Sequence, residues 1–397
     1  MPDIQTRSIC SVSVMDDSDP DIHFDADGVC QYVHIARRRL AEEVYRGADA
    51  ERRLGSLVAN IKADGEGKPY DCIAGVSGGV DSSYVLLRAK QLGLRPLAVH
   101  LDNGWNMEVA VANIERLVRR LDIDLFTHVV DWREIRDLQR CFFKASLPNV
   151  EVITDHAIFA LMYKKAAEYG LKYILTGSNV ETESIMPAAW GYDARDAAHI
   201  AGVHRRFGET PLRTFPLLPP HEFLRYTFLN GVKMAPILNY GPYNKAAVIA
   251  ELRAAIGYTP YDRKHGESRF TRFFQEYYLP RKFGVDKRKA HFSCLIVAGQ
   301  MGREAALAEL NKPLYQANDA EIDVEYVIKK LGFTASEWRG VMETPQQSFR
   351  AYPNKAWMFD HTNPLVLAVR AFAMGEYSPI KLARVVMATR AAARRRR

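Results

Sequence analysis

Short apolar runs alternate with longer amphipathic stretches over residues 69–208. Runs of this kind are typical of strands that are buried on both faces of a sheet, and the stretches between them have the length and spacing of helices. Gly93 and Gly170 stand just past two helix ends, where a left-handed cap is favoured. The pattern predicts strands at residues 72–76, 96–101, 125–130 and 173–176, and helices at residues 81–92, 107–121, 132–144 and 156–169.

The repeated strand–helix order predicts an α/β fold with a doubly wound, mostly parallel sheet. Ligands of such sheets bind in the crevice outside the carboxyl ends of the strands. The residues that directly follow each predicted strand are therefore the first place to look for a site.

The regions on either side of this alternation have other patterns. Residues 1–68 form a polar arm, then a helical segment at residues 32–61, then a turn-rich hinge, ADGEGKPY. Residues 209–397 read as a mostly helical domain that covers the strand ends. Its helices are expected at residues 245–256, 290–298, 303–310 and 323–331. A chain of 397 residues is longer than the chains that usually fold around a single hydrophobic core. We therefore expect units at residues 1–68, 69–208 and 209–397.

Composition places the chain among globular proteins. Apolar residues make up 48% and charged residues 25% of it, which is enough for a large buried core. No stretch approaches the roughly 20 apolar residues of a membrane span, and residues 1–21 lack an apolar secretion segment. The five cysteines are widely spaced and odd in number, which argues against a disulfide framework. We expect a cytoplasmic protein.

The net charge of +7 depends largely on the run RAAARRRR at residues 390–397, which supplies five arginines. A terminal run of like charges is usually solvated. Charge alone therefore gives no reason to expect nucleic acid as a partner.

The first predicted strand runs into GVSGGVDSS at residues 75–83, where a helix begins. A glycine pair lets the backbone approach a phosphate closely, and the helix N-terminus presents free N–H groups to it. Serine hydroxyls add donors, and Asp81 is well placed to hold a Mg²⁺ ion that bridges phosphates. The expected phosphate-binding residues are Ser77, Gly78, Gly79, Asp81, Ser82 and Ser83.

SGGVDSS resembles the signature of the PP-loop (ATP pyrophosphatase) superfamily, which includes NAD synthetase and asparagine synthetase. The resemblance implies that the loop grips the β,γ-pyrophosphate of ATP while a substrate oxygen attacks the α-phosphate. It also implies that Leu101 and Asp102 bind adenosine. ILTGSNVETE resembles the region of NAD synthetase around GT-x-N-x-x-E, which implies that Gly177 contacts ATP and Glu183 binds a second Mg²⁺, with Glu181 as the alternative.

Longer strings narrow the resemblance. AVHLDNGWN, ILTGSNVETESIMPAAWGY and DKRKAHFSCLIVAGQMGREAAL look like the N-acetyl sugar amidotransferases of bacterial surface-polysaccharide and O-antigen biosynthesis, over about residues 10–350. The resemblance implies that ATP activates an acetamido carbonyl on a nucleotide-activated sugar. Ammonia then replaces the oxygen and gives an acetamidino sugar. A separate glutaminase and a barrel-like conduit subunit supply the ammonia.

The chain itself offers no glutaminase signature. One class of glutaminase has a cysteine directly after the initiator methionine, where this chain has Pro2. The other class has a G-x-C-x-G elbow, which none of the five cysteines fits. The ammonia is therefore expected to arrive free or from a partner subunit.

Further residues are candidates for binding and catalysis. Lys287, in the basic segment at residues 285–289, could neutralise the pyrophosphate or the charge that builds on the α-phosphate. A solvated helix start is the competing interpretation. Residues around the third and fourth predicted strands could face the sugar, although caps or core packing would also explain them. They are Asp155, His156, Asn179, Trp190 and Tyr192.

The N-terminal arm departs from the family pattern. Relatives have two C-x-x-C pairs that resemble a Cys₄ zinc site, whereas only Cys10 and Cys30 remain here. Two thiolates are too few for a tight structural zinc site. We expect no zinc in this chain.

Three alternatives stay open. A PP-loop enzyme that modifies tRNA would also adenylate a carbonyl, although no C-x-x-C pair is present to carry sulfur. An enzyme that amidates a sugar carboxylate to a uronamide would use the same loop. A scaffold with an inactive loop is the third, and the intact motif argues against it.

Overall fold

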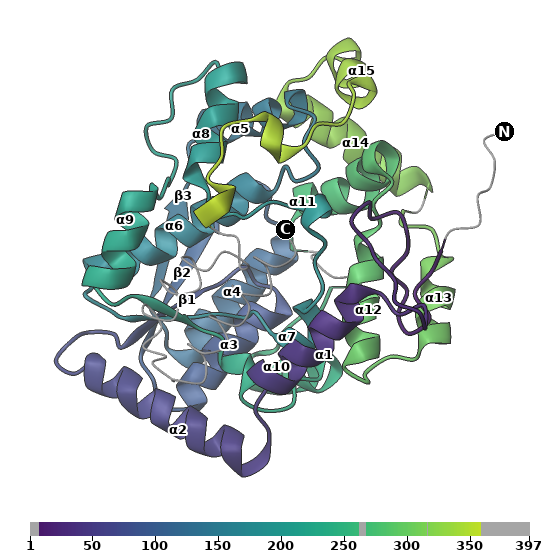
Figure 1. The fold of residues 1–397 in the computed structure, drawn as a ribbon. Coiled ribbons are helices and arrows are strands. Elements are labelled where there is room, and N and C mark those ends of the chain that lie inside the picture. Colours follow the sequence, from purple (N-terminus) through teal and green to yellow (C-terminus); the bar gives the residue numbers. More distant parts are fainter. Residues whose placement is uncertain (1–7, 262–266, 316, 359–397) are drawn as a thin grey trace, which may run out of the picture.

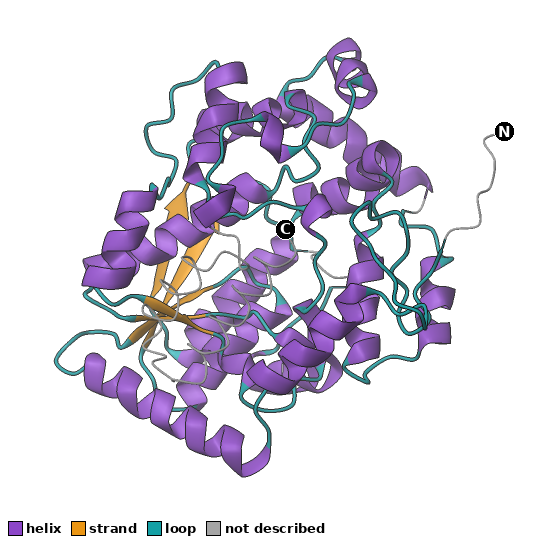
Figure 2. Ribbon diagram, in the orientation of Figure 1, coloured by secondary structure: helices purple, strands orange, loops and turns teal. Residues whose placement is uncertain are grey.

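The computed structural model describes residues 8–261, 267–315 and 317–358, and helices surround a small central sheet (Figures 1 and 2). The basic run at residues 390–397 lies outside the described residues. None of the described helices is long and apolar enough to cross a membrane.

The sheet confirms the expected doubly wound, parallel α/β fold. Its strands are β1 (Cys72–Gly75), β2 (Pro96–Asp102), β3 (Leu125–Val129), β4 (Tyr173–Leu175) and β5 (Lys233–Ala235). Their order is β3-β2-β1-β4-β5, and every neighbouring pair is parallel. The first four strands lie where the apolar runs predicted them. The fifth strand, β5, was not predicted, because it belongs to the segment expected to be helical.

Buried side chains alternate between the two faces of the sheet. In β1, Ile73 joins one apolar cluster, whereas Cys72 and Ala74 join the other. The second cluster is covered by α3 (Val80–Gln91), α4 (Glu108–Leu121) and α10 (Lys245–Ile256). The first is covered by α5 (Trp132–Lys144) and α6 (Val152–Glu168). This period of two is what a strand buried on both faces requires.

β1 and β4 lie side by side, although β2 and β3 come between them in the sequence and lie on the other side of β1. The strand order therefore reverses between β1 and β4. Such a switch point opens a crevice at the carboxyl ends of the strands. The loop after β4 meets the start of α3 there: a Cβ atom on Gly177 would lie 3.2 Å from the backbone carbon of Asp81.

The single helical segment expected at residues 32–61 is two helices, α1 (Gln31–Glu43) and α2 (Gly47–Asp64). The break occurs at Tyr45, which forms a parallel bridge with Tyr240 and donates its backbone N–H to the carbonyl of Asn239 at 2.9 Å. A long-range backbone contact therefore overrides local helix propensity.

The remaining helices follow β4 and β5. The first group is α7 (Val180–Glu183), η1 (Ala188–Trp190), α8 (Ala197–Phe207), α9 (Pro220–Leu224), η2 (Arg225–Leu229) and η3 (Ile237–Asn239). The second is α11 (Arg269–Phe273), η4 (Phe274–Phe283), α12 (Lys287–Val297), α13 (Arg303–Leu310), α14 (Ala317–Leu331), α15 (Ala335–Glu343), η5 (Phe349–Ala351) and η6 (Ala356–Met358). Residues 245–256 and 303–310 match the expected helices, whereas α12 and α14 begin earlier than expected.

The N-terminal arm lies against α12 and α13 (Figure 1). Lys289 of α12 pairs with Asp16 at 2.5 Å, and Arg303 of α13 donates to the carbonyls of Ser13 and Cys10 at 3.1 Å. One apolar cluster takes side chains from the arm, from one face of the sheet and from the C-terminal helices. The division into units at residues 1–68, 69–208 and 209–397 stays a prediction, but these segments share a core.

Candidate active site

The turn after β1 has a conformation that requires glycine. Gly78 has a φ of +79°, and a Cβ atom there would lie 2.4 Å from the carbonyl oxygen of Ala110. The Gly78 carbonyl accepts hydrogen bonds from the hydroxyls of Tyr258 and Tyr261 at 3.2 and 3.0 Å. The loop is thus pressed onto α4 on one side and held by two phenols on the other.

The hydroxyls of the loop organise its own backbone. Ser77 Oγ and Ser82 Oγ lie 3.2 Å apart, and Ser82 Oγ accepts from the Ser77 N–H at 3.2 Å. Ser77 Oγ also accepts from the Gly79 N–H at 3.3 Å. This arrangement makes a preformed concave turn at the N-terminus of α3, of the kind that binds phosphate.

Two cavities that share several lining residues lie at the strand ends. The larger has a volume of about 1210 Å³ and lies over the carboxyl ends of β1, β2 and β4. The smaller, about 230 Å³, lies directly against the loop after β1. Both share the side chains that matter most for the argument: Ser77, Ser82, Glu183, Lys245 and Glu267.

Asp81 lines the smaller cavity and accepts a hydrogen bond at Oδ1 from the hydroxyl of Tyr243. Burial raises the pKa of the Tyr243 phenol, and the charge of Asp81 raises it further. The phenol therefore stays protonated and donates, which fixes the orientation of the Asp81 carboxylate. The same tyrosine stands two residues before Lys245, so it also fixes the start of α10 relative to the loop.

The two glutamates of α7 have different surroundings. Glu181 is 4% exposed and binds Arg46 at 2.5 Å, the Tyr243 N–H at 2.8 Å and Gln300 at 3.2 Å. Glu183 is exposed and lines both cavities. Of the two, only Glu183 is placed to reach a metal ion beside the loop, and Glu181 is a structural tie between three segments.

The predicted cation Lys287 lines the larger cavity but not the smaller one. Lys245, at the first position of α10, lines both. Of these two lysines, Lys245 is the one that lines the small cavity at the loop, and it was not among the predicted site residues.

The residues expected to bind ATP separate into those that line a cavity and those that do not. Ser77, Gly79, Asp81, Ser82, Leu101 and Gly177 line one cavity or both, and Gly78 shapes the turn. Ser83 is fully buried, so its expected contact with phosphate is corrected to a core position. Asp102 stays a prediction: it is half-buried, and its Oδ1 accepts from the Gly104 N–H at 2.9 Å and from Asn106 at 3.3 Å.

Among the residues expected to contact the sugar, Asp155 lines the larger cavity. His156 does not. Its ring is fully buried, with Nδ1 2.5 Å from the carbonyl oxygen of Ala194 and Nε2 accepting from the Leu218 N–H at 3.0 Å. Burial lowers its pKa to about 4. His156 is thus a neutral structural histidine, and the expected contact with substrate is corrected.

Asn179, Trp190 and Tyr192 are also absent from the cavity lining. Asn179 caps α7 by accepting from the Thr182 N–H at 2.9 Å. Trp190 is 1% exposed, and Tyr192 donates its hydroxyl to Asp196. Core packing and capping, the competing interpretation for these residues, explain their positions.

Three residues at the loop were not predicted from the sequence: Tyr243, Lys245 and Glu267. The first two belong to NYGPYNK, residues 239–245, which precedes a strong helix. A glycine–proline turn followed by polar residues at a helix start was the available signal. No local sequence pattern marks Glu267. It lies beside the loop, because its Oε1 would be 3.3 Å from a Cβ atom on Gly79.

In the arm, Cys10 and Cys30 are fully buried. The N–H groups of Ser13 and Cys30 donate to Cys10 Sγ at 3.4 and 3.2 Å. Within the described ranges, no group of three or more His, Cys, Asp or Glu side chains is arranged to hold a metal ion.

Comparisons with known proteins found similarity over parts of the chain. Residues 267–363 match the family model described as "LPS biosynthesis protein WbpG-like, C-terminal domain". A stretch of 114 residues is 28% identical to tRNA(Ile)-lysidine synthase from Thermus thermophilus and covers 28% of this chain and 21% of that protein. The chain thus spans about a fifth of that curated relative.

Solved structures with a similar arrangement include NMN synthetase from Francisella tularensis, at 13% identity and a TM-score of 0.35, covering 66% of this chain and 91% of that chain. The NH3-dependent NAD synthetase from Campylobacter jejuni is 15% identical with a TM-score of 0.28, covering 54% of this chain and 100% of that chain. Residues 267–363 thus resemble a WbpG-like C-terminal domain, and the loop after β1, at the switch point of the parallel sheet, resembles the PP-loop signature.

Proposed function

We propose that the chain is an ATP-dependent, AMP-forming amidotransferase that converts the acetamido group of a nucleotide-activated sugar into an acetamidino group. The observation that supports this most directly is the small cavity at the loop after β1, lined by Asp81, Glu183 and Lys245, which shares lining residues with a cavity large enough for a second substrate.

In the proposed reaction, the acetamido oxygen attacks the α-phosphorus of ATP, and pyrophosphate leaves. Ammonia then adds to the activated carbon, AMP leaves with the former amide oxygen, and loss of a proton gives the amidine. An amide oxygen is a poor leaving group, whereas AMP is a good one. The loop amides and Lys245 would stabilise the charge of the departing pyrophosphate.

The site fits a magnesium ion. Mg²⁺ is usually held by one or two carboxylates together with substrate phosphates and water, and Asp81 and Glu183 both line the small cavity. Bound there, the ion would neutralise the negative charge of the pyrophosphate. Tyr243 would orient the Asp81 carboxylate for that contact.

The source of ammonia is proposed to lie outside the chain. Cys10, Cys30, Cys72, Cys141 and Cys294 are all buried. Burial raises the pKa of Cys72 well above its usual value and that of Cys141 to about 12. A glutaminase nucleophile must be a reachable thiolate, so we propose a partner glutaminase and a conduit subunit.

Product analysis with labelled ATP tests the proposal. The purified chain with a nucleotide-activated N-acetyl sugar and ammonium should form AMP and pyrophosphate, and ADP as the main product would contradict it. With glutamine in place of ammonium, no glutamate should be released. Offering a nucleotide-activated uronate in parallel separates amidine from uronamide formation, and a gel shift with tRNA at physiological salt tests the tRNA-modifying alternative.

A further inference from the structure

Helix α12 begins with consecutive cations, Lys287, Arg288 and Lys289, directly after its N-cap Asp286. The N-terminus of a helix has positive electrostatic potential, so cations in the first turn are unfavourable unless an anion lies beside each of them. The first turn of α12 contains no acidic residue. The groups that contact these three side chains therefore indicate why the turn contains three cations.

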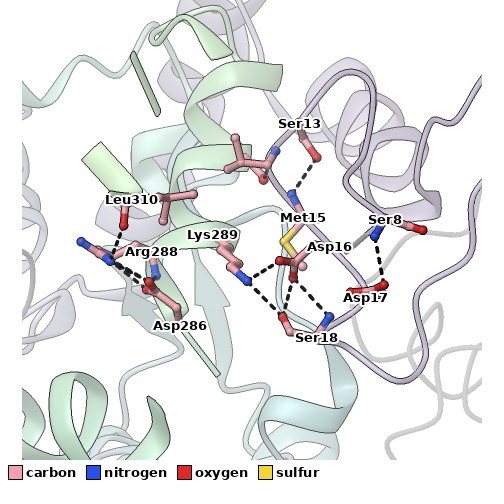
Figure 3. A network of polar contacts seen from close by, with 12 residues as sticks. Ser8, Ser13, Met15, Asp16, Asp17, Ser18, Asp286, Arg288, Lys289 and Leu310 are labelled. Atoms are coloured by element: carbon pink, nitrogen blue, oxygen red, sulfur yellow. Dashed lines mark hydrogen bonds and ion pairs between the residues drawn. The ribbon is translucent and has the colours of Figure 1, made fainter. Parts of the chain in front are cut away.

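Two of the cations have protein partners, which Figure 3 shows. Arg288 pairs with Asp286 at 2.8 Å and donates to the carbonyl of Leu310 at 3.1 Å. Lys289 pairs with Asp16 at 2.5 Å and with the hydroxyl of Ser18 at 3.3 Å. Both side chains thus join α12 to its surroundings, one toward α13 and the other toward the arm.

Lys287 differs from its neighbours. Within the part of the chain that the structure describes, the ion pairs and hydrogen bonds of this turn belong to Arg288 and Lys289 and none involves the Lys287 ammonium. Its Nζ lies 5.8 Å from the centre of the Phe274 ring. The side chain lines the larger cavity, one helical turn before His291, which lines it too. An uncompensated cation at an unfavourable position thus lies on the wall of a cavity.

The size of the cavity leaves room for more than ATP. Cavities that take one ligand have volumes of roughly 300 to 1,000 Å³, and this one has about 1210 Å³. The loop after β1 and Lys245 form part of its lining. The lining also includes the first turns of α12 and one face of α6, with Thr154, Asp155 and Ile158.

We propose that Lys287 binds the diphosphate of a second nucleotide, the nucleoside diphosphate group of the substrate, and that the pyrophosphate of ATP is bound by Lys245 instead. This assignment rests on the proposed function, because that function requires two nucleotides in one cavity. Among the residues that the structure describes, Arg288 and Lys289 each pair with a carboxylate of the protein, whereas Lys287 does not. The diphosphate would supply the negative charge beside Lys287.

Calorimetry on the full chain tests the assignment. The ATP site is first saturated with Mg²⁺ and the α,β-methylene analogue of ATP, and UDP, GDP, CDP and dTDP are then titrated in turn. We expect at least one of them to bind. Lys287→Gln should weaken that binding about tenfold, the effect of losing one charge-assisted contact, and leave the affinity for the ATP analogue within about twofold.

Two variants serve as matched controls. Lys245→Gln should weaken binding of the ATP analogue, and Lys329→Gln, which removes an exposed lysine of α14, should alter neither affinity. Lys287→Gln should also raise the melting temperature of the ligand-free protein by roughly 1 °C, because an unfavourable cation is lost from the first turn.

Three results would overturn the assignment: binding of no nucleoside diphosphate, displacement of the ATP analogue by it, or equal affinities for the Lys287→Gln variant and the wild type. Failure of the proposed function is read separately, as absence of AMP formation from labelled ATP. Binding of a nucleoside diphosphate beside the ATP analogue would stand even if the reaction differed.

Discussion

Two parts of the lining of the large cavity differ in the chemical groups that form them. The side at β1 consists of backbone and small side chains, with Gly78 locked against α4 and with Ser77 and Ser82 bonded to each other. The part formed by α6 and α12 consists of longer side chains. The first shape is fixed by dihedral angles and close packing, so it tolerates little change. The second can change by substitution without altering the fold, which makes it the natural place for substrate selection.

The largest expected effect is that of Gly78→Ala. Alanine at a positive φ costs about 1–2 kcal/mol, and overpacking against Ala110 adds about 1–3 kcal/mol. Urea unfolding should show a loss of about 2–5 kcal/mol, and AMP formation should be abolished. Gly257→Ala is the control, because its φ is +69° but nothing lies within 4 Å of the added Cβ. Equal losses for the two variants would mean that close packing against α4 does not define the loop.

His156 should make stability depend on pH. Its folded pKa of about 4 is lower than the unfolded value near 6.5, so the unfolded chain binds the proton more readily between these values. The contribution is present above about pH 6.5 and is lost as pH falls towards 4, by about 3 kcal/mol. Urea unfolding of His156→Gln should lack this part of the pH dependence, whereas exposed His221→Gln should retain it. If the stability of His156→Gln changed with pH as steeply as that of the wild type, the assignment of His156 as a buried neutral histidine would be wrong.

Asp81→Asn should lower AMP formation by more than about tenfold, or 1.4 kcal/mol, since the amide loses the charge that would hold Mg²⁺. Circular dichroism and the melting temperature should stay close to those of the wild type. A variant that keeps more than about a tenth of the wild-type rate would show that the metal is held elsewhere.

The two glutamates of α7 should give effects that differ in kind. Glu183→Gln should raise the Mg²⁺ concentration needed for half-maximal rate by several-fold, with unchanged stability. Glu181→Gln should lower stability by about 1–3 kcal/mol, because it removes the charge from a buried partner of Arg46, while the Mg²⁺ requirement stays the same. If Glu181→Gln changed the Mg²⁺ requirement and Glu183→Gln lowered stability, Glu181 would be the metal ligand and Glu183 the structural residue.

The sequence predicted those parts of the fold and site that depend on neighbouring residues. Apolar runs located β1 to β4, and a consecutive motif located the loop. β5 is only Lys233–Ala235, has no apolar run, and exists through its pairing with β4. Tyr243 and Glu267 reach the loop from distant segments. His156 and Trp190 were misassigned because their burial depends on tertiary contacts, such as those to Ala194 and Leu218, that local patterns do not contain.

The attachment of the N-terminal arm to α12 and α13 also sets an order of events during protein synthesis. Its contacts join residues 273 to 293 positions apart in the chain. A ribosome adds about 5 to 20 residues per second, so Cys10, Ser13 and Asp16 wait roughly 15 to 60 s before Lys289 and Arg303 exist. Throughout that interval the sheet can form while the arm has no surface to dock on. The arm is made well before α12 and α13 and is therefore among the last segments to reach its native position, and truncation before α12 would leave it without these partners.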